Sequence, residues 1–112
     1  MDLRSHMSGD IPVLQLASRF DNYVAPSVAE WLEKHTSFEH PCIIVDLEGV
    51  TFIDSTALAT LVQGLNRCRK LDGDLHLCGL RQQVYMIFEL TRLDKAFHIF
   101  VDEDHAIQAI TG

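Results

Sequence analysis

Apolar and polar positions follow two different periods along the chain. Short apolar runs, such as residues 11–17 and 42–47, are bounded by Pro, Gly or acidic residues and are typical of β-strands. Elsewhere apolar residues recur every three or four positions, and Val28, Trp31 and Leu32, for example, fall on one face of a helix. The pattern predicts four strands, at residues 11–17, 42–47, 75–79 and 98–101, and four helices, at about 26–36, 55–68, 81–91 and 102–110.

The alternation of strands and helices is typical of βαβ units with right-handed crossovers. We therefore expect an α/β fold, with helices packed on a mixed, mostly parallel sheet of about four strands. The segment 48–52, "EGVTF", is expected to be the turn between the second strand and the second helix. Residues 1–8 have no usable periodicity, and their "SHM" resembles a cloning remnant, so we expect a tag or disordered leader before a single domain at 9–112.

The charge of the chain excludes some classes of partner. Sixteen Asp and Glu against nine Lys and Arg give a formal net charge of −7, and the basic residues are scattered. Nucleic acids and anionic membranes require a basic surface, so we expect neither as a partner. There is no apolar run of about 20 residues that would span a bilayer and no charged-then-apolar signal segment, so the expected location is cytoplasmic.

Cysteine usage favours free thiols. Cys42, Cys68 and Cys78 are odd in number and form no Cys-x-x-Cys pair, which argues against a disulfide framework. Cys42 opens an apolar run and Cys68 lies on the apolar side of a helical pattern, so both are expected to be small buried hydrophobes. A thiol-based redox regulator is the alternative interpretation.

The segment "IDST" at residues 53–56 places a carboxylate and two hydroxyls between a buried strand and a helix. That edge of an open α/β sheet commonly carries the functional site. Asp54 or Ser55 could simply cap the helix. Alternatively, Ser55 is a phosphoacceptor, because a helix N-terminus tolerates the charge of a phosphate. The outward face expected for this helix is small and weakly charged, which favours an interaction surface: Thr56, Ala59, Thr60, Gln63 and Arg67.

Catalytic and metal sites find little support in the sequence. Ser55 lies in no Gly-x-Ser-x-Gly elbow, and no His or Lys stands out as its base. His76 and Cys78 form a lone His-x-Cys pair without matching ligands, so no metal site is expected. A phosphate-binding Gly-rich loop is also missing from the sequence, so we expect no cofactor and no enzymatic activity.

The region around Ser55 resembles the signature of the STAS domain, the module of sulphate transporters and anti-sigma factor antagonists. The segments "SRFDNYVAPSV" and "GLRQQVYMIFELTRLDKAFHIF" are similar to two further STAS motifs, so the resemblance spans roughly residues 11–110. The residues that match the signature in order are Asp46, Leu47, Val50, Phe52, Ile53, Asp54, Ser55, Thr56 and Leu58.

The resemblance implies a cytosolic regulator of partner switching. In the antagonist branch of the family, the unphosphorylated form binds a kinase-type anti-sigma factor and releases the sigma factor. The kinase phosphorylates the serine that matches Ser55, and a PP2C-type phosphatase restores the free form. Asp21, Asp54 and Thr56 would be neighbours of the phosphorylation site. The surface that binds the partner would include Ala57, Ala59, Thr60 and Gln63.

Three departures from the family pattern carry their own expectations. Ala57 and Arg92 replace family glycines, and Arg92 would be strained in a left-handed helix end. The usual extra N-terminal strand has little to match it, so it is expected to be short or absent. The alternative function is a STAS scaffold subunit of a stress-signalling or membrane-transport assembly.

Overall fold

The structure is a computed structural model that describes residues 3–111. It contains five strands, four α-helices and one 3-10 turn. In chain order these are β1 Arg4–Ser8, β2 Ile11–Phe20, α1 Ala25–His35, β3 Ile43–Ile53, α2 Ser55–Lys70, β4 Leu75–Cys78, α3 Gln82–Leu90, η1 Leu93–Lys95, β5 His98–Phe100 and α4 Glu103–Thr111.

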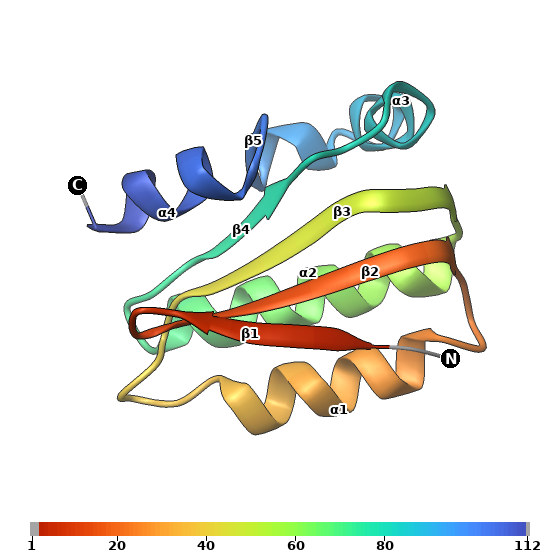
Figure 1. Ribbon diagram of the computed structural model, residues 1–112. Helices are drawn as coiled ribbons and strands as arrows, with labels where there is room; N and C mark the ends of the chain where they lie inside the picture. Colours follow the sequence, from red (N-terminus) through yellow and green to blue (C-terminus); the bar gives the residue numbers. More distant parts are fainter. Residues whose placement is uncertain (1–2, 112) are drawn as a thin grey trace.

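The strands form a single sheet in the order β1-β2-β3-β4-β5 (Figure 1). β1 pairs antiparallel with β2, and the other neighbouring strands pair parallel. The expected α/β fold with a mixed, mostly parallel sheet is confirmed, and β1 adds a fifth strand to the four that the pattern predicts.

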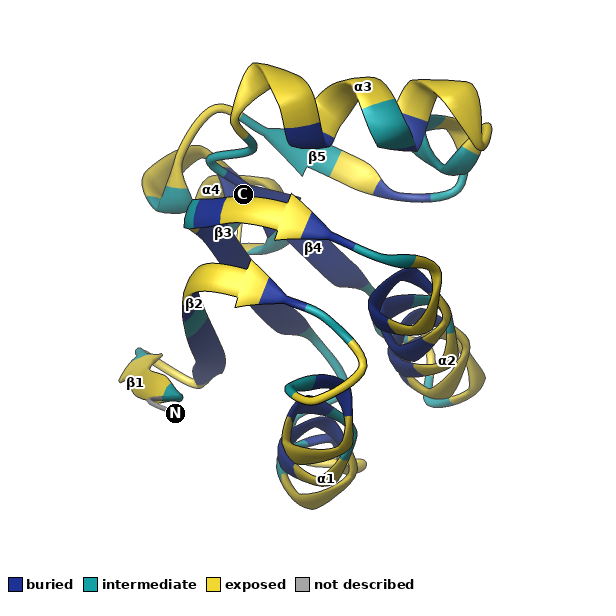
Figure 2. Cartoon of the chain, turned by 90° about the vertical axis from the view of Figure 1, so that its right-hand side faces the viewer, coloured by how far each residue is buried: buried dark blue, intermediate teal, exposed yellow. Residues whose placement is uncertain are grey.

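The sheet is covered on both faces because alternate strand residues point to opposite sides. Leu14, Leu16 and Val45 belong to the main core, to which α1, α2 and α3 contribute apolar side chains. Val13 and Ile44 point the other way, into a smaller core closed by α4. Figure 2 shows the resulting pattern, with dark buried residues on the sides of α1 and α2 that face the sheet.

β1 occupies part of residues 1–8, which the sequence predicts to be a tag or disordered leader. Residues 4–8 pair along their whole length with residues 11–15 of β2, and Gly9 makes the tight turn with a φ of +61°. The expectation of disorder is therefore wrong for residues 4–8, whereas residues 1–2 lie outside the described part of the chain. β1 is held by backbone pairing and is mostly exposed, so it has no apolar alternation that a sequence pattern could detect.

β3 runs through the segment "EGVTF", which the sequence predicts to be a turn. Its pairing with β2 continues as far as Phe20 and Ile53, with two register shifts in between. Gly49 lies inside the strand rather than in a turn. The position requires glycine because a Cβ there would come within 3.0 Å of both the Ala17 Cβ and the Leu16 carbonyl oxygen. Glycine in a strand often marks such a close approach of two backbones.

Arg92 follows α3 in the left-handed conformation, with φ 66° and ψ 11°, as the family glycine at this position implies. Because a Cβ is disfavoured there, we expect Arg92→Gly to raise the free energy of unfolding by up to about 1 kcal/mol. Leu90→Gly, in the last turn of α3, is the matched control and should lower it by about 1 kcal/mol. Urea denaturation of the three proteins measures both changes, and destabilisation by Arg92→Gly would contradict the expected strain.

Candidate functional site

The candidate site lies where β2 and β3 end and their loops lead into α1 and α2. Both loops lie at the same end of the molecule, which faces the viewer in Figure 2. They come together because β2 and β3 are parallel neighbours, so the carboxyl ends of the two strands meet at one edge of the sheet.

Asp54 connects the two loops through its carboxylate. Its Oδ1 accepts a hydrogen bond of 2.9 Å from the backbone N–H of Ala57, which caps the first turn of α2. Its Oδ2 accepts one of 2.8 Å from the backbone N–H of Asn22 in the β2–α1 loop. The capping role open to Asp54 or Ser55 in the sequence therefore falls to Asp54, which also fixes the neighbouring loop.

Asp21 organises the β2–α1 loop from within. Its Oδ1 accepts backbone hydrogen bonds of 3.0 Å from Tyr23 and 3.3 Å from Val24, and its Oδ2 lies 3.4 Å from the Arg19 Nε. Asp21 directly precedes Asn22, whose N–H is bonded to Asp54. The structure thus brings Asp21 and Asp54 into the same pair of joined loops.

Ser55 is the first residue of α2, and its side chain and that of Thr56 are exposed. The hydroxyl of Ser55 is therefore accessible at a helix N-terminus whose cap is supplied by another residue. Ala59 and Gln63 are exposed one and two turns further along α2.

The other two residues predicted to bind the partner, Ala57 and Thr60, lie in the interior. They are therefore not part of the exposed face of α2. Ala57 is fully buried in the main core, and Thr60 is 8% exposed. The Thr60 hydroxyl donates a 3.0 Å hydrogen bond to the carbonyl of Thr56 instead of facing solvent. Because α1 packs beside α2, the buried stripe of α2 is wider than the sheet-facing apolar residues alone suggest.

None of the hydrogen bonds that the histidines make within residues 3–111 is to Ser55. Each of the six is hydrogen-bonded to a residue elsewhere, through the pairs His6–Glu103, His35–Trp31, His40–Asp10, His76–Ala106, His98–Asp74 and His105–Asp102. Nucleophilic catalysis by Ser55 would require a base within hydrogen-bond reach of its hydroxyl.

Comparison with known proteins assigns the chain to a family. The sequence profile described as "STAS domain" matches residues 3–106, which is nearly the whole chain. The chain belongs to the STAS domain family.

Individual relatives and solved structures agree with the family assignment. The chain is 33% identical over 84 residues to the anti-sigma-B factor antagonist of Listeria monocytogenes, covering 75% of this chain and 74% of that protein. Its fold matches that of an anti-sigma factor antagonist from Mycobacterium paratuberculosis, with a TM-score of 0.88 at 21% identity over 99% and 94% of the two chains. It also matches the phosphorylated form of the Bacillus cell fate determinant SpoIIAA, with a TM-score of 0.75 at 15% identity over 97% and 99%.

The STAS domain carries exposed aromatic side chains at this edge that the sequence does not predict to be part of the site. Tyr23, in the β2–α1 loop, is 84% exposed, and Phe52, near the end of β3, is 39% exposed. The guanidinium carbon of Arg19 lies 4.0 Å from the centre of the Phe52 ring, a cation–π contact. Phe52 matches the family signature, but its exposure depends on the extension of β3, which the sequence pattern does not predict.

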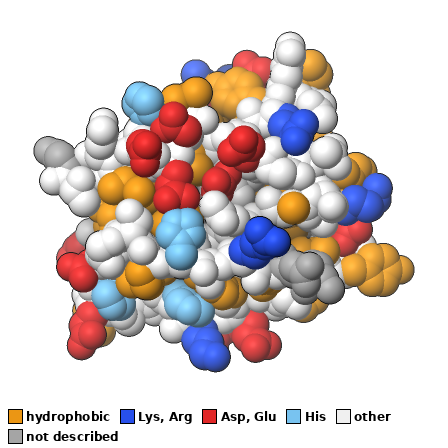
Figure 3. Space-filling model, viewed as in Figure 1, with side chains coloured by type: hydrophobic (Ala, Val, Ile, Leu, Met, Phe, Trp, Pro, Cys, Tyr) orange, Lys and Arg blue, Asp and Glu red, His pale blue; other side chains and the backbone are white. Residues whose placement is uncertain are grey.

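Charge on the surface agrees with the composition. On the face seen in Figure 3, Asp and Glu side chains gather near the middle of the upper half, whereas Lys and Arg appear singly. No helix within residues 3–111 is both long enough and apolar enough to cross a membrane.

The cysteines of the STAS domain are free, and two of them are deeply buried. Burial raises the pKa of the Cys68 thiol to about 11 and that of the Cys78 thiol to about 12. We expect iodoacetamide at neutral pH to modify Cys42, which is half-buried, but to reach the other two only after denaturation. Peptide mass spectrometry measures this, and rapid labelling of Cys68 or Cys78 in the folded protein would instead favour a redox role.

Proposed function

We propose that this STAS domain is a cytoplasmic anti-sigma factor antagonist, a binding protein rather than an enzyme. In its unphosphorylated form it binds a kinase-type anti-sigma factor and so frees the sigma factor. Phosphorylation of Ser55 ends that binding, and a PP2C-type phosphatase reverses it. The observation that carries the proposal is the exposed Ser55 hydroxyl at the first position of α2, beside the carboxylate of Asp54.

A phosphate on Ser55 is compatible with the fold. The side chain is exposed, so the three added oxygens displace no packed group. The capping bond of α2 comes from Asp54 and does not involve the Ser55 hydroxyl. The dipole and free N–H groups at a helix N-terminus favour an anion by roughly 0.3–1 kcal/mol, which offsets part of the repulsion from Asp54.

The same phosphate would disrupt a complex formed on this surface. Thr56, Ala59 and Gln63 lie on the exposed face of α2 and Tyr23 on the adjoining loop, and we define these four residues with Ser55 as the Ser55 surface. These residues are uncharged, so a partner can pack against them without burying an ion. A phosphate in their midst brings a hydrated charge of about −2 into the contact, which the partner would have to desolvate.

Affinity capture with matched variants tests the proposal. Tagged Ser55→Ala and Ser55→Asp proteins are incubated with a lysate of the organism that encodes the chain. The expected result is that Ser55→Ala retains a protein with a kinase-type ATP-binding domain and that Ser55→Asp does not. Retention of the same protein by both variants would refute control by Ser55.

Gel filtration with light scattering on the purified protein distinguishes the proposed antagonist from the scaffold alternative. A partner-switching antagonist is expected to elute as a small, defined species. A persistent high-order assembly, together with no kinase-type protein retained by Ser55→Ala, would favour the scaffold subunit.

A further inference from the structure

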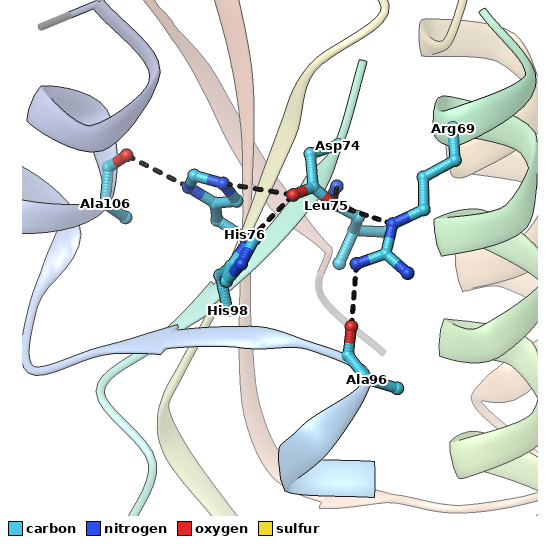
Figure 4. A network of polar contacts seen from close by, with 7 residues as sticks. All are labelled: Arg69, Asp74, Leu75, His76, Ala96, His98 and Ala106. Carbon is cyan, nitrogen blue, oxygen red and sulfur yellow. Dashed lines mark hydrogen bonds and ion pairs between the residues drawn. The ribbon is translucent and has the colours of Figure 1, made fainter. Parts of the chain in front are cut away.

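Three potential metal ligands meet at the edge of the sheet opposite the Ser55 surface. They are Asp74, directly before β4, His76 within β4, and His98 at the start of β5. One ligand atom from each lies within 4.8 Å of the other two. Figure 4 shows the side chains of His76 and His98 both directed toward the carboxylate of Asp74. β4 and β5 are parallel and their register pairs His76 with His98, so the sheet itself brings the two imidazoles together.

His76 is buried, and its ring is oriented by the backbone of α4. Its Nδ1 donates a 3.2 Å hydrogen bond to the carbonyl of Ala106, and its side chain is only 6% exposed. In the neutral form an imidazole has a single N–H, so this bond leaves a lone pair on Nε2. That lone pair points at the Asp74 Oδ2, 3.5 Å away, where it faces another acceptor. A cation between the His76 Nε2 and the Asp74 Oδ2 could accept an electron pair from each of them.

Asp74 is oriented in a similar way. Its Oδ1 accepts hydrogen bonds from the Leu75 backbone N–H at 2.9 Å and from the Arg69 Nε at 3.3 Å. Arg69 is itself held by a 2.7 Å bond to the carbonyl of Ala96. The other oxygen, Oδ2, therefore remains for the two histidines. In metal sites the ligands are commonly oriented by outer hydrogen bonds of this kind.

His98 completes the group from the solvent side. Its Nδ1 donates a 2.8 Å hydrogen bond to the Asp74 Oδ2, and its side chain is 64% exposed. Nδ1 can bind a metal after its proton has moved to Nε2 through the surrounding water, since the two neutral tautomers differ only in which nitrogen carries it.

We propose that Asp74, His76 and His98 form a binding site for a late first-row divalent cation of the zinc type. In a tetrahedral zinc site, bonds of about 2.0–2.1 Å place ligand atoms roughly 3.4 Å apart. The 3.5 Å separation of the His76 Nε2 and Asp74 Oδ2 matches this value. The His98 Nδ1 lies 2.8 Å from the same oxygen, so the exposed His98 side chain would have to shift for all three atoms to bind one ion. Two imidazoles and one carboxylate suit zinc-type cations better than Mg²⁺ or Ca²⁺, which prefer oxygen ligands alone.

The cleft beside these residues leaves room for a further ligand. It has a volume of about 410 Å³ and is also lined by Cys42, Asp72 and Phe100. A water molecule could occupy the fourth position, and the carboxylate of Asp72 adds negative charge to the walls. The site joins β4, β5 and α4, so an ion bound there would hold these C-terminal elements together.

Isothermal titration of the full chain with Zn²⁺ at neutral pH tests the proposal. We expect saturable binding of one ion per chain. The Kd of His98→Gln should be at least ~10-fold higher, since loss of even an outer partner of a metal ligand commonly lowers metal affinity 10–100-fold. His98 is exposed, so this substitution should leave the fold intact. His105→Gln is the matched control, because His105 is also exposed and paired with a carboxylate, that of Asp102, yet should bind Zn²⁺ like the wild type.

A measurement on the unmodified protein gives an independent readout. Co²⁺ is expected to produce the intense visible absorption of a four- or five-coordinate site, and one equivalent of Zn²⁺ should abolish it, whereas Mg²⁺ should not. Absence of one-to-one Zn²⁺ binding, or equal Zn²⁺ affinity for wild type and His98→Gln, would overturn the proposal. This site does not depend on Ser55, so its failure would leave the proposed function untouched.

Discussion

Ser55→Asp is expected to weaken binding of the anti-sigma factor by at least ~100-fold, which corresponds to about 2.7 kcal/mol. The substitution places a permanent charge at the centre of the Ser55 surface, where the wild type presents a neutral hydroxyl. A buried charge without a partner of opposite sign typically costs several kcal/mol at an interface. Titration calorimetry with the protein captured by Ser55→Ala measures the two affinities.

A control variant separates the effect of where the charge lies from the effect of simply adding a negative charge to the chain. Ser37→Asp adds the same charge in the loop after the far end of α1, where Ser37 is also exposed. This variant should bind the anti-sigma factor as tightly as the wild type does. The free energy of unfolding of both variants should lie within about 1 kcal/mol of the wild-type value. An equal loss of affinity in the two variants would mean that general charge repulsion, rather than the Ser55 surface, governs binding.

Asp54→Ala is expected to lower the free energy of unfolding by about 2 kcal/mol, because it removes an N-cap and the acceptor for a second loop at once. The N–H groups of Ala57 and Asn22 both lose their partner. Asp54→Asn should lose less, since its single carbonyl oxygen can still accept one of the two bonds.

Chemical denaturation of these variants provides the measurement. Glu30→Ala, at an exposed position of α1, is the control and should change the free energy of unfolding by less than about 0.5 kcal/mol. If Asp54→Ala were no more destabilised than Glu30→Ala, the carboxylate could not be holding the two loops together.

The sequence predicts those parts of the fold that depend on local periodicity. The apolar faces of α1 and α2 and the buried run at the start of β3 follow directly from residue spacing. β1 and the second half of β3 do not, because they are stabilised by backbone pairing across the sheet and carry mixed or exposed side chains. Gly49 signals a turn locally but is required by contact with Ala17, more than 30 positions away.

The candidate sites show the same division. Asp54 and Ser55 lie next to each other in the chain, so their position at a helix N-terminus can be predicted. The bond from Asp54 to Asn22 and the exposure of Tyr23 depend on two loops meeting in space. The ligand group at the opposite edge depends on the pairing of β4 with β5, so His98 lies 22 positions from His76 and no spacing motif connects them.

Direct phosphorylation tests whether Ser55 is the phosphoacceptor. The purified chain is incubated with ATP and the kinase captured by Ser55→Ala, and the modified peptide is sequenced by mass spectrometry. The expected result is one phosphoryl group on Ser55 and none on the Ser55→Ala protein. A phosphate on Thr56 or elsewhere in the wild type, or undiminished phosphorylation of Ser55→Ala, would contradict it.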